Sequence, residues 1–148
     1  MFARLTVFFD RLVGRRSYRI HRVVYRWTWG IIGHRTMFGP MLLLTTTGRK
    51  TGQQRTTPLL YMPDGARYLV VGSNGGRPQP PAWILNVAAT PAVRIQVGRR
   101  RLAAQAEVLG PEERAALWPR MTEHYKGWAH YEDLTDRALK VVALTPQP

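Results

Sequence analysis

One segment of this chain, residues 42–59, constrains its fold more than any other, because two strand-like runs flank an unusual turn. Threonine and branched hydrophobic residues, which favour β-strands, dominate both runs. Between them, Gly48 and Gly52 supply the backbone freedom that a tight turn needs. The turn also carries Arg49 and Lys50 side by side, although like charges repel. A hairpin does not need this pair, so the sequence predicts a hairpin whose turn receives an anionic ligand.

Several familiar site types are absent from the sequence. The turn lacks the G-x-x-x-x-G-K-[ST] spacing of a Walker A loop, and the chain contains no G-x-G-x-x-G motif. There is no cysteine, which excludes disulfides, thiolate metal sites and cysteine nucleophiles. The four histidines have neither metal-ligand spacing nor an accompanying carboxylate cluster, so we expect no metal site.

The whole chain has a net charge of +13, and its positive charge is concentrated in the first two thirds. Residues 1–35 carry eight arginines against Asp10, and residues 36–106 carry nine cations against Asp64. Residues 107–148 reverse this balance, with five cations against seven acids. A basic body of this kind indicates a polyanionic partner, which is a nucleic acid, an anionic membrane or a highly charged small molecule.

Hydrophobic periodicity predicts one amphipathic helix over residues 1–28, with arginines along its flank. Its apolar face either lies on an anionic membrane surface or covers the rest of the domain or a second subunit. No run approaches the ~18 apolar residues of a spanning helix, so we expect this segment to be neither transmembrane nor a signal peptide. We therefore divide the chain into residues 1–40, the helix and an irregular linker, and residues 41–148, the main domain.

Beyond the linker, the pattern favours short strands with a few helices between them. We expect strands at 41–47, 55–62, 68–73, 93–97, 102–108 and 139–144, helices at 82–89, 111–125 and 129–137, and a loop at 74–81. Several strands follow one another directly, without the regular strand–helix alternation of a parallel sheet. The sequence therefore predicts an α+β, mainly β domain: a small barrel of about six mostly antiparallel strands.

A series of short motifs runs through the same region in a fixed order. The motifs are L-T-T-T-G-R-K-T-G at 44–52, Asp64-Gly65, S-N-G-G at 73–76, P-A-W-I-L-N at 81–86, P-A-V at 91–93, E-E-R at 112–114 with Trp118, and T-D-R at 135–137. In order and spacing the chain resembles the deazaflavin-dependent nitroreductases, a branch of the split β-barrel flavin and deazaflavin oxidoreductases. The resemblance implies a split β-barrel with an N-terminal amphipathic helix and further helices packed around the barrel.

The resemblance also implies a cofactor, coenzyme F-420, which is a 5-deazaflavin whose tail carries a phosphate and several glutamates. The cofactor-binding residues that it implies are Arg49, Lys50, Thr51, Arg55, Thr56, Thr57, Pro58, Leu59, Leu60, Val71, Gly72, Ser73, Asn74, Ala82, Trp83, Ile84, Leu85, Asn86 and Trp128. The basic residues of this set would meet the anionic tail, and the segments at 71–74 and 82–86 would border the ring.

The implied reaction is hydride transfer from reduced coenzyme F-420 to a quinone such as menaquinone, or to a nitroaromatic compound. The implied catalytic residues are Ser73, Tyr125, Trp128 and Tyr131. Trp128 stands where relatives carry a tyrosine that closes over the cofactor, and an indole N–H only donates a hydrogen bond. This departure puts reduction of nitro compounds in doubt more than reduction of quinones.

Two alternatives stay open. The same fold could bind FMN, or reduce a fatty acid or a xenobiotic, although Arg49, Lys50 and Arg55 together favour a long anionic tail. The chain could instead be a non-catalytic basic module that binds nucleic acid or anionic lipid. Its aromatic residues do not interleave with cations as in a base-stacking platform, so we expect no nucleic acid partner. We expect a cytoplasmic monomer or homodimer, peripheral at the inner face of the cell membrane where residues 1–28 contact lipid.

Overall fold

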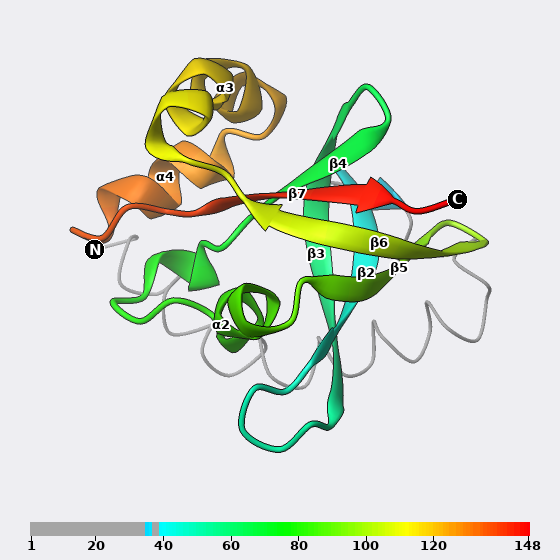
Figure 1. The fold of residues 1–148 in the computed structure, drawn as a ribbon. Helices are drawn as coiled ribbons and strands as arrows, with labels where there is room; N and C mark the ends of the chain where they lie inside the picture. The colour runs from blue at the N-terminus through cyan, green and yellow to red at the C-terminus, as the bar shows by residue number, and fades with distance from the viewer. Residues whose placement is uncertain (1–34, 37–38) are drawn as a thin grey trace.

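The computed structural model describes residues 35–36 and 39–148, in which antiparallel strands form one sheet. The strands are β1 (Arg35–Thr36), β2 (Gly39–Thr47), β3 (Gln54–Asp64), β4 (Arg67–Val71), β5 (Ala92–Val97), β6 (Arg100–Val108) and β7 (Val141–Pro146). Their order in the sheet is β1-β2-β3-β4-β7-β6-β5, and β2 also pairs with β5. Strands β2 to β7 therefore close into a six-stranded barrel (Figure 1), as the sequence predicts.

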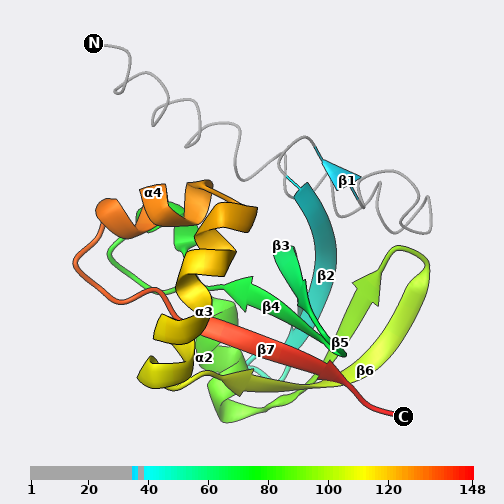
Figure 2. The ribbon, with the colours of Figure 1, turned by 90° about the horizontal axis from the view of Figure 1, so that it is seen from above.

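Four helical segments connect the strands: η1 (Asn74–Gly76), α2 (Ala82–Ala89), α3 (Pro111–His124) and α4 (Gly127–Asp133). In Figure 1, β6 and β7 lie between α3 above and α2 below, and α4 packs beside α3. The turn of the β2–β3 hairpin projects beyond the barrel on the same side as α2. Figure 2, seen from above, shows α3 and α4 together on one side of the barrel, next to β4 and β7.

Proline sets the start of both long helices. Pro81 precedes α2 with an extended backbone, and its carbonyl accepts a hydrogen bond from the Ile84 amide at 3.1 Å. Pro111 is the first residue of α3, and Glu112 and Glu113 follow in the first turn, where the helix dipole favours negative charge. These local signals explain why the predicted bounds of α2 are confirmed and those of α3 are correct to within one residue.

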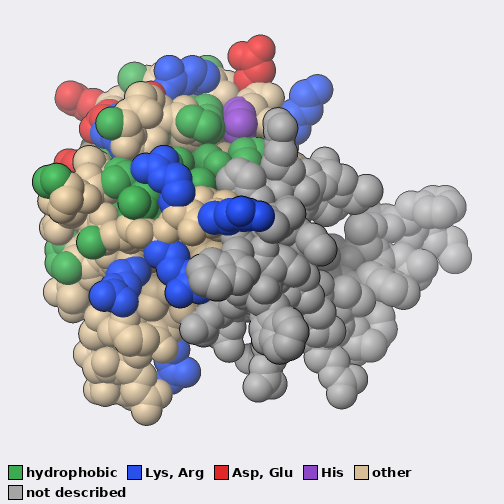
Figure 3. All heavy atoms as spheres, turned by 90° about the vertical axis from the view of Figure 1, so that its right-hand side faces the viewer, with side chains coloured by type: hydrophobic (Ala, Val, Ile, Leu, Met, Phe, Trp, Pro, Cys, Tyr) green, Lys and Arg blue, Asp and Glu red, His purple; other side chains and the backbone are tan. Residues whose placement is uncertain are grey.

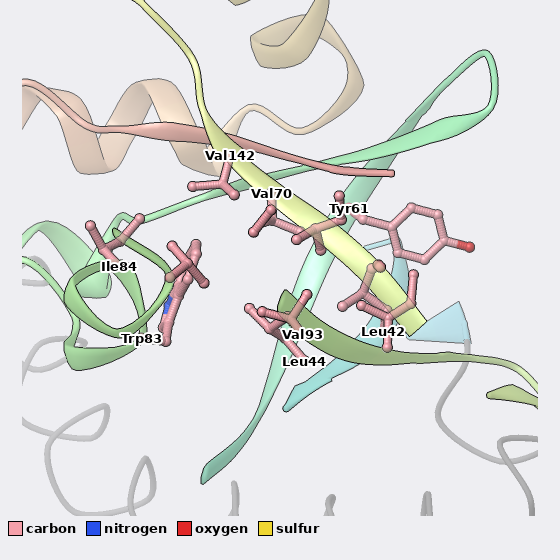
Figure 4. Close-up of a cluster of buried hydrophobic side chains, with 13 residues drawn as sticks. Leu42, Leu44, Tyr61, Val70, Trp83, Ile84, Val93 and Val142 are labelled. Atoms are coloured by element: carbon pink, nitrogen blue, oxygen red, sulfur yellow. The ribbon is translucent and has the colours of Figure 1, made fainter. Parts of the chain in front are cut away.

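Two hydrophobic clusters lie on opposite faces of β7. Val142 and Leu144 face the barrel interior, where they pack with Leu42 and Leu44 of β2 (Figure 4). Val141 and Ala143 face α3 and α4 and belong to the second cluster. The other buried members of this cluster are Met62, Leu69, Val71, Leu109, Met121, Trp128 and Leu139. The first four residues of β7 are thus buried on both faces, which explains why residues 141–144 are all hydrophobic.

Several sequence predictions differ from the structure. Strand β3 ends two residues later than predicted, β4 ends two residues earlier, and β6 begins two residues earlier. Residues 35–36 and 39–40 are strand rather than irregular linker, because they pair with each other at the edge of the sheet. The predicted loop at 74–81 contains η1, and β7 begins and ends two residues later than predicted. Helix α4 spans 127–133 instead of 129–137, because residues 134–140 leave the helix to contact the segment after β4.

The predicted helix at 1–28 lies outside the described residues. Within the part of the chain that the structure describes, no helix is long and apolar enough to span a membrane.

Asp64, at the end of β3, accepts hydrogen bonds from Arg67, at 2.8 Å from Nε, and from Arg120. Chiefly through the bond from Arg67, the pKa of the Asp64 carboxyl lies below its usual value. A depressed pKa means that Asp64 stabilises the fold above the unfolded-state pKa of about 3.9, and that this contribution is lost as the pH falls through the folded-state pKa. We expect Asp64→Asn to lower the free energy of unfolding at neutral pH. We also expect the free energy of unfolding to decrease less in the variant than in the wild type as the pH is lowered.

Urea unfolding at a series of pH values checks this prediction. Asp133→Asn is the control, because Asp133 is exposed and forms no ion pair with any described residue. Equal pH dependence of the two variants would contradict the prediction.

Candidate active site

The β2–β3 hairpin ends in a tight turn that favours glycine at two positions. The Gly48 amide donates to the Gln53 carbonyl at 2.7 Å, and the Gly52 amide donates to the Gly48 carbonyl at 2.8 Å. Gly52 has a φ of +71°, in the left-handed region that favours glycine. A Cβ on Gly48 would lie 2.9 Å from Oγ1 of Thr51, closer than such contacts normally allow. The turn thus presents the neighbouring Arg49 and Lys50 to solvent in a fixed backbone shape.

A buried amide side chain fixes this turn against α2. Oδ1 of Asn86 accepts a hydrogen bond from the Arg49 backbone amide at 3.1 Å, and Nδ2 donates to Oγ1 of Thr46 at 3.2 Å. Asn86 is 6% exposed, and a buried amide is stabilising only when its polar atoms are paired. Asn86 therefore sets the position of the basic turn relative to the helix.

Between the hairpin and α2 lies a cavity of about 500 Å³. It is lined by Gly48, Arg49, Lys50, Thr51, Arg55, Thr56, Thr57, Ala82, Trp83 and Asn86. Apart from Gly48, every lining residue belongs to the set predicted to bind the cofactor. One side of the cavity is basic and rich in hydroxyls, and α2 contributes the indole of Trp83.

The positive charge of this cavity is not neutralised within the described part of the chain, where Arg49, Lys50 and Arg55 form no ion pair with an acidic side chain. On the face shown in Figure 3, acidic side chains gather near the top of the molecule, and basic ones continue below them. A cavity with unpaired cations, hydroxyls and turn amides suits a ligand with phosphate or carboxylate groups.

Other predicted cofactor residues lie outside the cavity lining. Pro58 is buried, and Leu59 and Leu60 pack against the first and second hydrophobic clusters respectively. On α2, Ile84 belongs to the barrel core, whereas Leu85 is half-buried. Their assignment to the cofactor stays a prediction.

The two segments predicted to border the ring, 71–74 and 82–86, lie against each other. After β4 ends at Val71, the chain passes so close to α2 that a Cβ on Gly72 would lie 2.6 Å from Cγ1 and Cδ1 of Ile84. The Gly72 amide donates to the Lys140 carbonyl at 2.9 Å, which ties the same point to the segment before β7. The end of β4 is thereby fixed between α2 and the C-terminal part of the chain.

The four predicted catalytic residues do not line the 500 Å³ cavity. Ser73 is half-buried at the start of η1. Trp128 is 3% exposed inside the second cluster, and its ring meets the Tyr125 ring edge-on at 5.5 Å between centroids. Tyr125 and Tyr131 pack against the same cluster. Their catalytic roles, and a role of Trp128 in covering the ring, therefore stay predictions.

One residue of this region had no predicted role. Arg137 donates hydrogen bonds from Nη1 to the Gly72 carbonyl at 3.0 Å, from Nη2 to the Ser73 carbonyl at 2.8 Å, and from Nε to the Arg77 carbonyl at 3.0 Å. Burial lowers the pKa of its guanidinium from the usual value. The T-D-R motif at 135–137 was the available sequence signal, but the sequence does not identify the carbonyls that the arginine contacts.

The described residues contain no group of three or more histidine, aspartate or glutamate side chains placed to hold a metal ion.

Comparison with known proteins yields consistent similarities. A family model described as F420H(2)-dependent quinone reductase matches residues 17–146. An F420H(2)-dependent quinone reductase of Mycobacterium tuberculosis (strain ATCC 25618 / H37Rv) is 43% identical over 140 residues, which cover 92% of this chain and 94% of the relative.

Solved structures that share the fold include two with sequence identity above 30%. A structure of an F420-H2 dependent reductase (FDR-A) is 39% identical, with a TM-score of 0.65 over 71% of this chain and 93% of that chain. A structure described as a domain-swapped dimer is 34% identical, with a TM-score of 0.67 over 85% of this chain and 93% of that chain.

Proposed function

This chain belongs to the F420H(2)-dependent quinone reductase family, and from that premise we propose that it is an oxidoreductase that uses reduced coenzyme F-420 to reduce a quinone. The observation that carries the proposal is the basic cavity between the β2–β3 hairpin and α2. Its unpaired cations fit a cofactor whose tail carries a phosphate and several carboxylates better than one with a single phosphate, such as FMN.

We assign the binding of the cofactor tail to the hairpin side of the cavity. Arg49, Lys50 and Arg55 would donate charge-assisted hydrogen bonds to the phosphate and glutamate oxygens. The absence of a side chain at Gly48 lets the turn close tightly against Thr51 and Gln53, with Gly48 itself lining the cavity beside Arg49 and Lys50. Asn86 would keep this turn in place during binding, since it joins the turn to α2.

The bound cofactor would supply a hydride, so that the quinone gains two electrons in one step and takes up a proton as it becomes the hydroquinone. The protein orients the partners and limits access of water. We place the ring beside the 71–74 segment, close to α2. The hydroxyl of Ser73 and the phenols of Tyr125 and Tyr131 are our candidates for holding a proton near the acceptor.

Three finer assignments belong to the same proposal. We propose a lipid-soluble acceptor such as menaquinone, with residues 1–28 contacting anionic lipid at the inner face of the membrane; the support is the basic amphipathic pattern of that segment. We also propose a homodimer, supported by the relative described as a domain-swapped dimer. A nitroaromatic compound is a second acceptor class, for which Trp128 in place of tyrosine is the critical difference.

Quenching of tryptophan fluorescence tests the cofactor assignment, because Trp83 lines the cavity. We expect saturable quenching by oxidised coenzyme F-420 and weak or no quenching by FMN. Trp83→Phe should remove a large part of the signal if the cofactor binds in this cavity. Binding of FMN alone would keep the fold assignment but replace the proposed cofactor. Binding of neither compound would favour the non-catalytic basic module that binds nucleic acid or anionic lipid.

A further inference from the structure

A single side chain from near the end of the chain fastens the 72–77 segment, which follows β4 and contains η1. The three carbonyls that Arg137 contacts lie at both ends of this segment: Gly72 and Ser73 at its start, and Arg77 at its end. The distances of 2.8–3.0 Å are those of well-formed hydrogen bonds. The guanidinium thus bridges the segment and holds its two ends at a fixed separation.

The chemistry of arginine is specific to this contact. A guanidinium presents planar donors in a rigid fork, whereas a lysine ammonium is a compact group that cannot reach three carbonyls in the same geometry. The Arg137 side chain forms no ion pair with a carboxylate of the described residues, and its guanidinium instead donates to the three backbone carbonyls.

Packing holds the same segment from two further sides. At its start, Gly72 lies against Ile84 of α2; at its end, a Cβ on Gly76 would lie 2.8 Å from Cβ of Leu134 and 3.0 Å from the Tyr131 carbonyl. Figure 1 shows the segment running between α4 and α2. The segment is therefore placed by contacts with α2, with α4 and with Arg137, whose three hydrogen bonds add to the bond between the Gly72 amide and the Lys140 carbonyl.

We propose that Arg137 is a positioning residue for the cofactor: it sets the shape of the 72–77 segment, and through this segment the fit of the deazaflavin ring. The proposal rests on the proposed function, in which residues 71–74 border the ring. Arg137 acts through the backbone, so its loss changes cofactor affinity by loosening the segment.

Three variants separate this role from general support of the fold. Arg137→Met keeps much of the side-chain length but removes every donor, and Arg137→Lys keeps the charge without the fork. Arg77→Gln is the matched control, because it removes a positive charge from the same segment while its backbone carbonyl still accepts from Arg137. The Arg77 side chain is exposed and forms no ion pair with a described residue.

Two measurements are made on each full-length variant: amide hydrogen exchange without cofactor, followed by mass spectrometry, and titration with oxidised coenzyme F-420. For Arg137→Met we expect exchange in peptides covering 72–77 to quicken by about tenfold or more, with peptides of β2 and β5 unchanged. We expect the Kd to rise by about tenfold or more, as for the loss of hydrogen bonds to a charged group. Arg137→Lys should recover part of both effects, and Arg77→Gln should resemble the wild type.

Each outcome decides the proposal. Unchanged exchange at 72–77, or faster exchange with unchanged affinity, overturns the positioning role. Faster exchange throughout the protein assigns Arg137 to general stability and also overturns it. If the wild-type protein does not bind coenzyme F-420, the proposed function fails. Faster exchange at 72–77 in Arg137→Met would then show only that Arg137 stabilises this segment. If the wild type binds and Arg137→Met binds equally well, this inference alone fails.

Discussion

Removal of both basic side chains at the hairpin turn, in the double variant Arg49→Ala/Lys50→Ala, is expected to weaken binding of coenzyme F-420 by about 2–5 kcal/mol. The estimate follows from about 1–3 kcal/mol for each charge-assisted hydrogen bond, reduced because both side chains are exposed. It corresponds to a rise in Kd of about 30-fold to several thousand-fold. Lys50→Ala alone should cost about 1–3 kcal/mol. Fluorescence titration at fixed ionic strength measures both.

A matched variant tests whether cofactor affinity depends on the position of the removed cations or only on the net charge of the protein. Arg99→Ala/Arg100→Ala removes the same charge at the β5–β6 turn, and neither residue lines the 500 Å³ cavity. We expect its Kd to stay within about threefold of the wild type, because exposed charges at a distance are largely screened at physiological ionic strength. Equal losses in the two double variants would indicate a general electrostatic effect, and an unchanged Kd in Arg49→Ala/Lys50→Ala would remove the tail-site assignment.

The basic turn was predictable because its signals are local. Glycines at 48 and 52 and cations at 49 and 50 define both its backbone and its charge, and the structure places Gly48, Arg49 and Lys50 together around one cavity. Helix α2 was predictable for the same reason, since Pro81 marks its start. The barrel followed from the succession of short strands, although closure depends on the pairing of β2 with β5, about 50 residues apart, which no local signal encodes.

The region near the predicted ring site was harder to predict, because its contacts join distant parts of the chain. Arg137 reaches carbonyls about 60–65 residues earlier, and these contacts take residues 134–137 out of the predicted helix. Trp128 gives a similar lesson. The motif spacing predicts that Trp128 covers the ring; the structure buries the indole in the cluster between α3, α4 and β7, and the covering role stays a prediction. The sequence identifies these side chains as unusual, but their partners come from tertiary structure.

The contact between Gly72 and Ile84 leads to the second large expected effect, a loss of stability in Gly72→Ala. The new methyl group would lie 2.6 Å from two side-chain carbons of Ile84, so the buried Ile84 side chain, α2 or the end of β4 must move. We expect the free energy of unfolding to fall by about 1–3 kcal/mol, the usual cost of overpacking. Affinity for coenzyme F-420 should fall too, since Trp83 and the 72–74 segment would shift with the displaced backbone. Urea unfolding and cofactor titration measure the two effects.

A double-mutant cycle shows whether this loss comes from the proposed contact. Ile84→Ala alone should cost about 2–5 kcal/mol through the cavity that it leaves, but that cavity also accepts the methyl group of Gly72→Ala. The double variant should therefore be more stable than the sum of the two losses predicts, with a coupling of about 1–3 kcal/mol. Gly110→Ala is the control, because a Cβ there meets no atom within 4 Å, and it should change stability by less than about 1 kcal/mol. Additive losses in the cycle would contradict close packing between the end of β4 and α2, and with it the geometry that places the two proposed ring-side segments against each other.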